Sequence, residues 1–439
     1  MARPRDILHP DFKARPFWWE EAPPTSAGGG EAPPARADVV VVGAGYSGLN
    51  AALALRKGGA EVAVLDARPF GWGASSRNAG HVSSGVNLGK GSSSAVRSPM
   101  EGHMSADTVA ALRREAGEAF DILERRLAEF SIDAGYRRSG RFVGAVSPAH
   151  YEGLAGKQAS FAASGVHMVP RAEQKSEIDS DSFHGGMVVA RSGYLQPAKY
   201  LHGLVAAARA AGAVLVPEMP VLGLERRAGG WRVMTSSGVV DADRVLIATN
   251  GYTGALVPWL RRRVIPAASY VVVTEPLPEG LMKTLIPQGR TIADTRRLLS
   301  YFRPADNGRR LLFGGRATLR QKPPEAVGHR LYARILRIFP QLRGIRLTHA
   351  WSGSIAFTFD VLPHVGERDG IAYCMGCNGS GVVMQSYLGW RTGEALLGGE
   401  KSAFWNQKFP SLPGYWGLPW FLPFMTGYYG LRDRLDGAG

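Results

Sequence analysis

Three glycines near the start of the chain have a spacing that suits phosphate binding. Gly43, Gly45 and Gly48 form a G-x-G-x-x-G pattern, which follows four consecutive valines and opens a stretch of helical composition. The next apolar run ends at Asp66, 18 residues after Gly48. In such a strand–helix–strand unit the glycines let the backbone approach a pyrophosphate, and the acid accepts hydrogen bonds from a ribose. The pattern predicts a dinucleotide site, without separating FAD from NAD.

A loop of small and polar residues follows Asp66 and suits contacts with a flat ring or a phosphate. The segment "GWGASSRNAGH" carries Ser75, Arg77, Asn78 and His81. Its small residues permit close packing, and its hydroxyl and amide groups supply neutral hydrogen bonds. Judged alone, the loop is also consistent with a solvated surface turn.

Cys374 and Cys377, the only two cysteines, have C-x-x-C spacing in "IAYCMGCNGSGVVM". A zinc site normally has four ligands, and His364 is the one further candidate nearby, so we expect no metal site. A redox dithiol is the alternative, because a helix after the pair would lower the pKa of a thiol. The surrounding sequence indicates a strand, a glycine turn and a helix, so we interpret the spacing as accidental.

The elements that must position these groups can be outlined from periodicity. Residues 38–66 indicate a strand, a helix and a second strand, and their continuous apolar runs are typical of a parallel sheet. Residues 104–130 and 196–212 indicate helices, and residues 257–350 mix strand-like runs with a basic helix. Glycine-rich turns return after Trp351. This order predicts two interleaved domains.

Composition limits the class of protein. The net charge is +15, but the basic residues are scattered and no nucleic-acid-binding motif accompanies them, so we expect no nucleic-acid partner. No signal peptide and no membrane span are recognised, and cytoplasm is the expected location. The aromatic, proline-rich tail at 401–439 is expected to pack on the body. Its prolines argue against a continuous amphipathic helix, with membrane contact a minor alternative.

Seven motifs in order along the chain resemble those of one family. They are "DVVVVGAGYSGL", "GWGASSRNAGH", "VLIATNGY", "LLFGGR", "IFPQLRGIRLTHAWSG", "CNGSGVV" and "YYGLRDRL". The chain resembles the FAD-dependent amine and amino-acid oxidoreductases of the D-amino-acid oxidase superfamily, most closely the gamma-glutamylputrescine oxidase group. The resemblance implies an α/β and α+β fold, with a Rossmann-like FAD-binding domain interleaved with a mixed-sheet substrate domain. It also implies hydride transfer from a carbon beside an amine nitrogen to the flavin N5, followed by hydrolysis of the imine.

The resemblance also implies domain limits and cofactor contacts. The expected limits are 38–96, 188–256 and 351–400 for the FAD-binding domain, 97–187 and 257–350 for the substrate domain, 1–37 for an arm and linker, and 401–439 for the tail. The implied FAD contacts are Gly43, Gly45, Gly48, Asp66, Ser75, Arg77, Asn78, Val221, Thr249, Asn250, Gly251, Gly353, Asn378, Gly379, Gly381 and Val382.

Two departures from the family affect these expectations. His81 stands where close relatives often carry Gln, and Ser380 replaces a histidine of the commoner turn. We expect FAD to be bound without a covalent link, with a histidyl link through the His81 region as the alternative. The helix after the "NGSG" turn is expected to direct its N-terminus at the flavin N1–O2 edge.

The substrate residues are predicted less sharply, and no obligatory acid or base is expected. The pocket candidates are Tyr301, Arg303, Arg316, His81 and His349. Arg316 suggests an acidic substrate group, because a guanidinium can hold a carboxylate or phosphonate by two bonds. The expected partners are a small amine or amino acid and O2 or another electron acceptor. The alternatives are a sarcosine- or N-methyl-amino-acid-type oxidase and a non-catalytic flavin-binding subunit.

Overall fold

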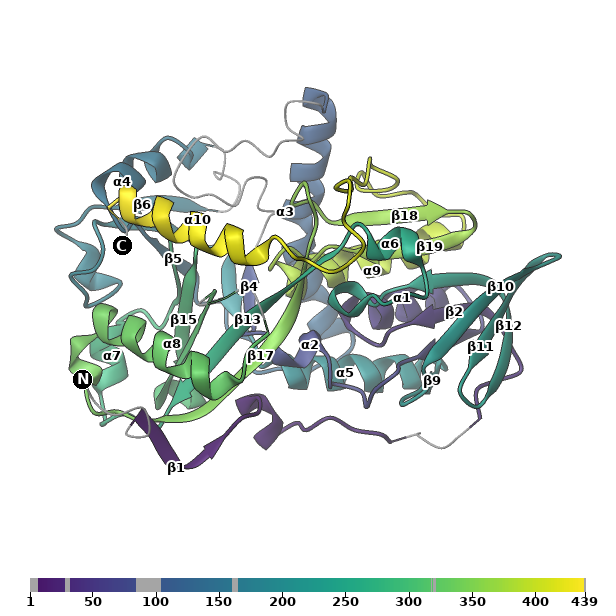
Figure 1. The fold of residues 1–439 in the computed structure, drawn as a ribbon, viewed down its shortest axis with the longest axis horizontal. Coiled ribbons are helices and arrows are strands. Elements are labelled where there is room, and N and C mark those ends of the chain that lie inside the picture. The colour runs from purple at the N-terminus through teal and green to yellow at the C-terminus, as the bar shows by residue number, and fades with distance from the viewer. Residues whose placement is uncertain are drawn as a thin grey trace.

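The computed structural model describes residues 7–27, 32–83, 104–159, 165–316, 318 and 321–437. Two large sheets lie on opposite sides of the molecule, and helices pack against both (Figure 1). Each sheet is assembled from separated parts of the chain. The expected combination of a Rossmann-like sheet and a mixed sheet is confirmed. The expected domain limit at residues 96 and 97 lies outside the described residues.

The first sheet contains the strand that precedes the glycine turn. Five of its strands are parallel neighbours in the order β19-β12-β2-β3-β9, and their apolar side chains are buried on both faces. The strands are β2 (Arg36–Val42), β3 (Val62–Leu65), β9 (Val214–Val216), β10 (Val221–Arg227), β11 (Gly230–Thr235), β12 (Gly238–Ile247), β18 (His364–Arg368) and β19 (Ile371–Met375).

Four helices pack with this sheet or with one another. Helix α1 (Tyr46–Lys57) and helix α9 (Gly381–Leu396) are in close contact, because Cβ atoms placed on Gly389 and Gly393 would lie 2.2 and 2.6 Å from backbone oxygens of α1. Helices α3 (Ala106–Glu129) and α5 (Pro197–Ala210) join the same apolar cluster.

The second sheet has the order β1-β17-β13-β16-β15-β14-β5-β7-β6. Aromatic and aliphatic side chains on one face, including Phe142, Phe302 and Phe313, pack against helices α7 and α8. The other face is left for the cavity described below. The elements are β1 (Leu8–Lys13), β5 (Arg141–Gly144), β6 (Val166–Val169), β7 (Gly186–Val189), β13 (Ile265–Thr274), β14 (Thr291–Asp294), β15 (Ser300–Ala305), β16 (Arg310–Gly315), β17 (Leu347–Phe357), α7 (Leu281–Leu285) and α8 (Pro324–Ile338).

Short elements complete the described chain. Strands β4 (His81–Ser83) and β8 (Ser192–Tyr194) form a separate pair. The remaining helices are α2 (Ala74–Arg77), α4 (Pro148–Ala155), α6 (Pro258–Arg261) and α10 (Leu422–Leu435), with 3₁₀ turns η2 (Phe17–Glu20), η4 (Gln174–Ser176), η5 (Asn250–Tyr252), η6 (Asp306–Gly308) and η7 (Pro340–Leu342).

The N-terminal segment is integrated into the fold. Strand β1 pairs in parallel with β17, so the expected arm contributes an edge strand to the second sheet. The indole of Trp18 is buried and donates to the carbonyl of Asn78 at 2.9 Å, and that of Trp19 donates to Ser76 Oγ at 3.0 Å. The aromatic residues at 17–19 therefore attach this segment next to the polar loop.

The C-terminal tail ends in helix α10, which begins after the prolines at 410, 413 and 419, so no helix runs through those three prolines. Helix α10 accommodates Pro423 in its first turn, where proline is tolerated because that amide has no helical partner. Asp433 is buried and accepts the backbone N–H groups of Arg297 and Leu298 at 3.0 and 3.1 Å. The outer side chains of Phe424, Tyr428 and others are exposed. No described helix is long and apolar enough to span a membrane.

The Asp433 contact yields the first prediction. Asp433→Asn removes the charge that Arg297 faces and places amide hydrogens near two N–H donors, so we expect a loss of roughly 1.5–3 kcal/mol of local stability. Limited trypsin digestion with mass spectrometry should show faster cleavage in α10. Asp241→Asn is the control, because its ion pair with Arg232 is exposed and contributes little. Equal cleavage of wild type and Asp433→Asn would contradict the role of Asp433 in attaching α10 to residues 297 and 298.

Candidate functional site

One continuous cavity connects the glycine turn with the open face of the second sheet. Its volume is about 1290 Å³. A pocket for a drug-sized ligand has about 300–1,000 Å³, so this cavity has room for a large ligand and a small one together. Residues from both sheets line it, from Gly43 and Asp66 at one end to Arg141 and Arg316 at the other.

The glycine turn has the close packing that its spacing predicted. Gly43 has φ 107°, and a Cβ on Gly48 would lie 1.9 Å from the carbonyl oxygen of Gly43. Helix α1 begins directly after Gly45, and its first residues, Tyr46 and Ser47, line the cavity. Asp66 accepts from the amide of Ala44 at 2.8 Å, and burial raises the pKa of its carboxyl group.

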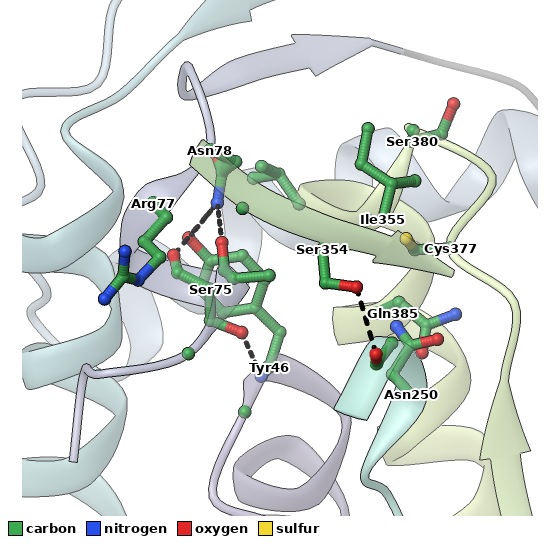
Figure 2. A pocket seen from close by; sticks show the side chains of 18 of the residues that line it. Tyr46, Ser75, Arg77, Asn78, Asn250, Ser354, Ile355, Cys377, Ser380 and Gln385 are labelled. Atoms are coloured by element: carbon green, nitrogen blue, oxygen red, sulfur yellow. Dashed lines mark hydrogen bonds between the residues drawn. The ribbon is translucent and has the colours of Figure 1, made fainter. Parts of the chain in front are cut away.

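The polar loop folds into the short helix α2 beside the glycine turn. Ser75 Oγ accepts the amide of Tyr46 at 3.2 Å, and the Asn78 amide donates to the carbonyl of Ser75 at 2.9 Å. Figure 2 shows these side chains together on one side of the cavity. The Arg77 guanidinium donates to the carbonyls of Trp72 and Ser352. At least two N–H groups of Arg77 are therefore bonded to backbone carbonyls of the protein.

The opposite wall comes from the ends of β12 and β17. Asn250 Oδ1 accepts the amide of Gly376 at 3.0 Å, and Ser354 Oγ donates to the carbonyl of Gly251 at 3.0 Å. Figure 2 shows Asn250, Ser354, Cys377 and Gln385 on this side. Val221, Thr249 and Gly353 also line the cavity.

The turn between β19 and α9 lies at the same cavity. Gly379, Gly381 and Val382 line it, and α9 begins at Gly381, so the positive end of its dipole faces the cavity. Asn378 does not line it. Its side chain is buried, accepts the amide of Thr358 at 3.1 Å and donates to the carbonyl of Gly376 at 3.0 Å. Asn378 thus fixes the shape of the turn and leaves the ligand contacts to its neighbours.

The two cysteines have different surroundings. Cys374 is buried between β19 and α9, and burial raises the pKa of its thiol to about 12. Cys377 is half-buried and lines the cavity. Among the described residues no group of three or more His, Cys, Asp and Glu side chains is arranged to hold a metal ion.

The open face of the second sheet forms the far end of the cavity. Alternate residues of its strands face inward, among them Ser269 on β13, Tyr301 on β15 and Arg141 on β5. The Tyr301 hydroxyl is 2.9 Å from Ser269 Oγ, and the rings of Tyr301 and His81 meet edge to face with centroids 5.5 Å apart. Arg316 follows β16 on the other side of Tyr301.

Burial controls the charge state of His81. The buried Nε2 of His81 has no hydrogen-bond partner among the described residues. Burial, with the charges of Arg141 and Arg303, lowers the pKa of His81 well below 6.5. His81 is therefore a neutral imidazole at physiological pH.

Two of the five substrate candidates lie outside the cavity. Arg303 is buried beneath Trp18 and Tyr194, and its guanidinium donates to the carbonyls of Ala79, Leu195 and Pro304. His349 is buried against Thr348 and Glu20. His81, Tyr301 and Arg316 do line the cavity. Arg141 and Ser269 line it too and were not predicted, because no motif surrounds them.

Comparison with known proteins gives consistent matches along the chain. Residues 38–395 match the model of the DAO family, described as FAD dependent oxidoreductase. "Probable oxidoreductase OrdL" of Rhizobium meliloti (strain 1021) is 31% identical over 420 residues, which are 91% of this chain and 92% of that protein. "Gamma-glutamylputrescine oxidoreductase" of Escherichia coli (strain K12) is 32% identical over 410 residues, or 91% and 93%.

Solved structures are similar in fold. The glycine oxidase of Geobacillus kaustophilus aligns with a TM-score of 0.70 at 22% identity, covering 84% of this chain and 96% of that one. The L-proline dehydrogenase of P. horikoshii aligns with a TM-score of 0.67 at 18% identity, covering 90% and 99%.

The glycine contact gives the second prediction. Gly48→Ala forces α1 away from the turn, because the new Cβ would overlap the Gly43 carbonyl. Overpacking of this kind costs roughly 1–3 kcal/mol, so FAD affinity should fall about 5- to 100-fold. Gly427→Ala in α10 is the control, because its Cβ would meet nothing within 4 Å. FAD titration of the two apoproteins measures the difference. Equal FAD affinities of Gly48→Ala and Gly427→Ala would contradict a role of the glycine turn in FAD binding.

Proposed function

The chain belongs to the DAO family of FAD-dependent oxidoreductases, and on that premise we propose that it oxidises the carbon–nitrogen bond of a small amine or amino acid. The observation that carries the proposal is the single cavity that joins the glycine turn, the N-terminus of α9 and the polar face of the second sheet. One part suits a dinucleotide and the other suits a small polar substrate.

The residues of the first part fit FAD. The close approach of Gly48 to Gly43, and Gly45, where a Cβ would crowd Ser75 Oγ at 3.1 Å, would provide the cradle that a pyrophosphate needs. Asp66 would accept from the ribose, and Val221 and Thr249 also line the cavity. Gly353, Gly381 and Val382 would hold the ring near the substrate face. When bound, FAD accepts the hydride that leaves the substrate carbon.

The chain supplies orientation and electrostatics for this step. The start of α9 directs a positive dipole end at the region where negative charge would gather. Tyr301 and the neutral His81 line the part of the cavity that would hold the substrate, with their rings in edge-to-face contact. A neutral amine that loses hydride becomes an iminium ion, and water hydrolyses that ion to a carbonyl compound and ammonium. No residue must act as an acid or base in the hydride step.

Two alternatives remain within this site. An N-methyl amino acid would react at its methyl carbon and release formaldehyde. A flavin-binding subunit without turnover would bind FAD through the same cradle. The electron acceptor is O2 or another oxidant.

The third prediction tests the reaction. Purified holoenzyme, mixed without oxygen with a panel of primary amines and amino acids, should lose its flavin absorbance with at least one of them. Alanine and 2-aminoisobutyrate form a control pair, because the second has no hydrogen on the carbon beside nitrogen. Bleaching only by sarcosine with formaldehyde release would favour the first alternative. A flavin that no amine reduces would contradict catalysis. Peroxide detection after admission of air identifies O2 as the acceptor.

The fourth prediction concerns how FAD is held. We expect acid precipitation to leave the flavin in the supernatant, because binding through the backbone cradle needs no covalent link. His81 and Cys377 are the described histidine and cysteine that line the cavity. Flavin that stays with the precipitated wild type and is lost from His81→Ala or Cys377→Ala would show a covalent link and identify its residue.

A further inference from the structure

Two arginines in the cavity lack the partners that buried guanidinium groups normally have. The Nε of Arg141 is buried without a hydrogen-bond partner, and the described residues offer its guanidinium no ion pair. The guanidinium of Arg316 likewise has no hydrogen bond or ion pair with described residues, and it lies 4.7 Å from the Phe357 ring centre. The Nε of Arg191 also lacks a partner, but a terminal nitrogen of its guanidinium is paired with Asp121, and Arg77 and Arg297 are bonded to carbonyls or carboxylates.

Both residues are half-buried, and within Arg141 the Nε atom is fully buried. Burial lowers the pKa of Arg141 to about 10 and also lowers that of Arg316. A guanidinium carries five N–H donors in a fixed fork, and a buried charge is normally paired. Two such groups facing one cavity indicate that the ligand supplies the missing negative charge.

The strand pairing places the two arginines on opposite sides of Tyr301. Strands β5, β14, β15 and β16 are neighbours in this order. Arg141 on β5 pairs with Thr291 on β14, and Tyr301 on β15 pairs with Ala293 on β14. Arg316 follows Gly315 of β16 and lies opposite Leu299, just before β15. With strands about 4.8 Å apart and about 3.3 Å of rise per residue, their backbones are roughly 19 Å apart along the diagonal. Both residues line the same cavity as Tyr301 and His81, and two extended arginine side chains could span most of that distance.

We infer that the substrate is an amine with two acidic groups, one bound by Arg141 and the other by Arg316. This inference rests on the proposed amine oxidation and specifies its substrate class. The guanidinium fork matches the two oxygens of a carboxylate or a phosphonate. The amine would lie between the acids, beside His81 and Tyr301.

The first test compares substrates on the holoenzyme. Anaerobic flavin reduction is measured with neutral amines, monoacids such as glycine and alanine, and diacids such as iminodiacetate, aspartate, glutamate and 2-aminoadipate. We expect kcat/KM for the best diacid to exceed that of its matched monoacid about 10- to 100-fold. 3-Phosphonoalanine beside aspartate shows whether the second group is a phosphonate or a carboxylate. Monoacids equal to or better than diacids would overturn the inference and leave amine oxidation standing.

Variants assign the effect to the two arginines. Arg141→Met and Arg316→Met should each reduce the diacid preference at least about tenfold, and the lysine variants should restore part of it. Arg191→Met is the matched control, because this cavity-lining arginine is already paired with Asp121 at 2.6 Å. If either methionine variant keeps the full preference for diacids over monoacids, the arginine replaced in that variant does not bind an acidic group of the substrate.

A binding measurement separates this inference from the catalytic proposal. Titration of the holoenzyme with succinate, glutarate and adipate, which have no amine to oxidise, should perturb the flavin spectrum. Acetate and butyrate should bind at least about tenfold more weakly. Each methionine variant should lose this difference. Dicarboxylates that bind no better than monocarboxylates would contradict the inference whether or not any amine is oxidised.

Discussion

The close packing of α1 against α9 is the constraint on which the rest of the site depends. Gly389 and Gly393 of α9 lie against the backbone of α1, where a Cβ would approach Ser47 and Ala51 oxygens within 2.2 and 2.6 Å. Helices this close begin at the same cavity, one directly after Gly45 and the other at Gly381. Two positive dipole ends therefore face one ligand, which suits a cofactor with a pyrophosphate at one end and an electron-accepting ring at the other.

The second sheet contributes polar and charged side chains to the cavity. Its inner face presents Ser269, Tyr301 and Arg141 at alternate strand positions, while its outer face is closed by α8. The C-terminal helix is bonded through Asp433 to the turn that carries Arg297 and Leu298, close to Arg316. The tail thus supports the end of the cavity that Arg297 and Arg316 line, although it is far from the glycine turn in the chain.

Local sequence was sufficient to predict residues that meet at the cavity around the glycine turn, and insufficient for the face of the second sheet. The glycine turn, Asp66 and the loop of Ser75 to Asn78 are defined by short-range spacing, and all of them meet at the cavity. Arg303 stands two residues from Tyr301 on the same face of β15, but Trp18 and Tyr194 cover it. Whether Arg303 faces the cavity therefore depends on Trp18 and Tyr194, which lie far from it in the sequence.

Arg141, Asn378 and the C-terminal tail also show where the structure adds to the sequence-based expectations. Arg141 has no motif around it, and it reaches the cavity because β5 pairs with β14 some 150 residues later. Asn378 belongs to a motif that does reach the cavity, yet its amide is used to hold the turn. The prolines of the tail argued against a continuous amphipathic helix, and helix α10 begins only at the last of them, since Pro423 occupies a first turn where it is tolerated.

A crystal structure of the holoenzyme is the most direct test of the shared cavity. We expect the pyrophosphate of FAD within hydrogen-bond distance of the first amides of α1, and the flavin ring edge at the start of α9, facing Tyr301. FAD bound in the reverse direction, or with its ring away from the face that carries Tyr301, would contradict the proposed site.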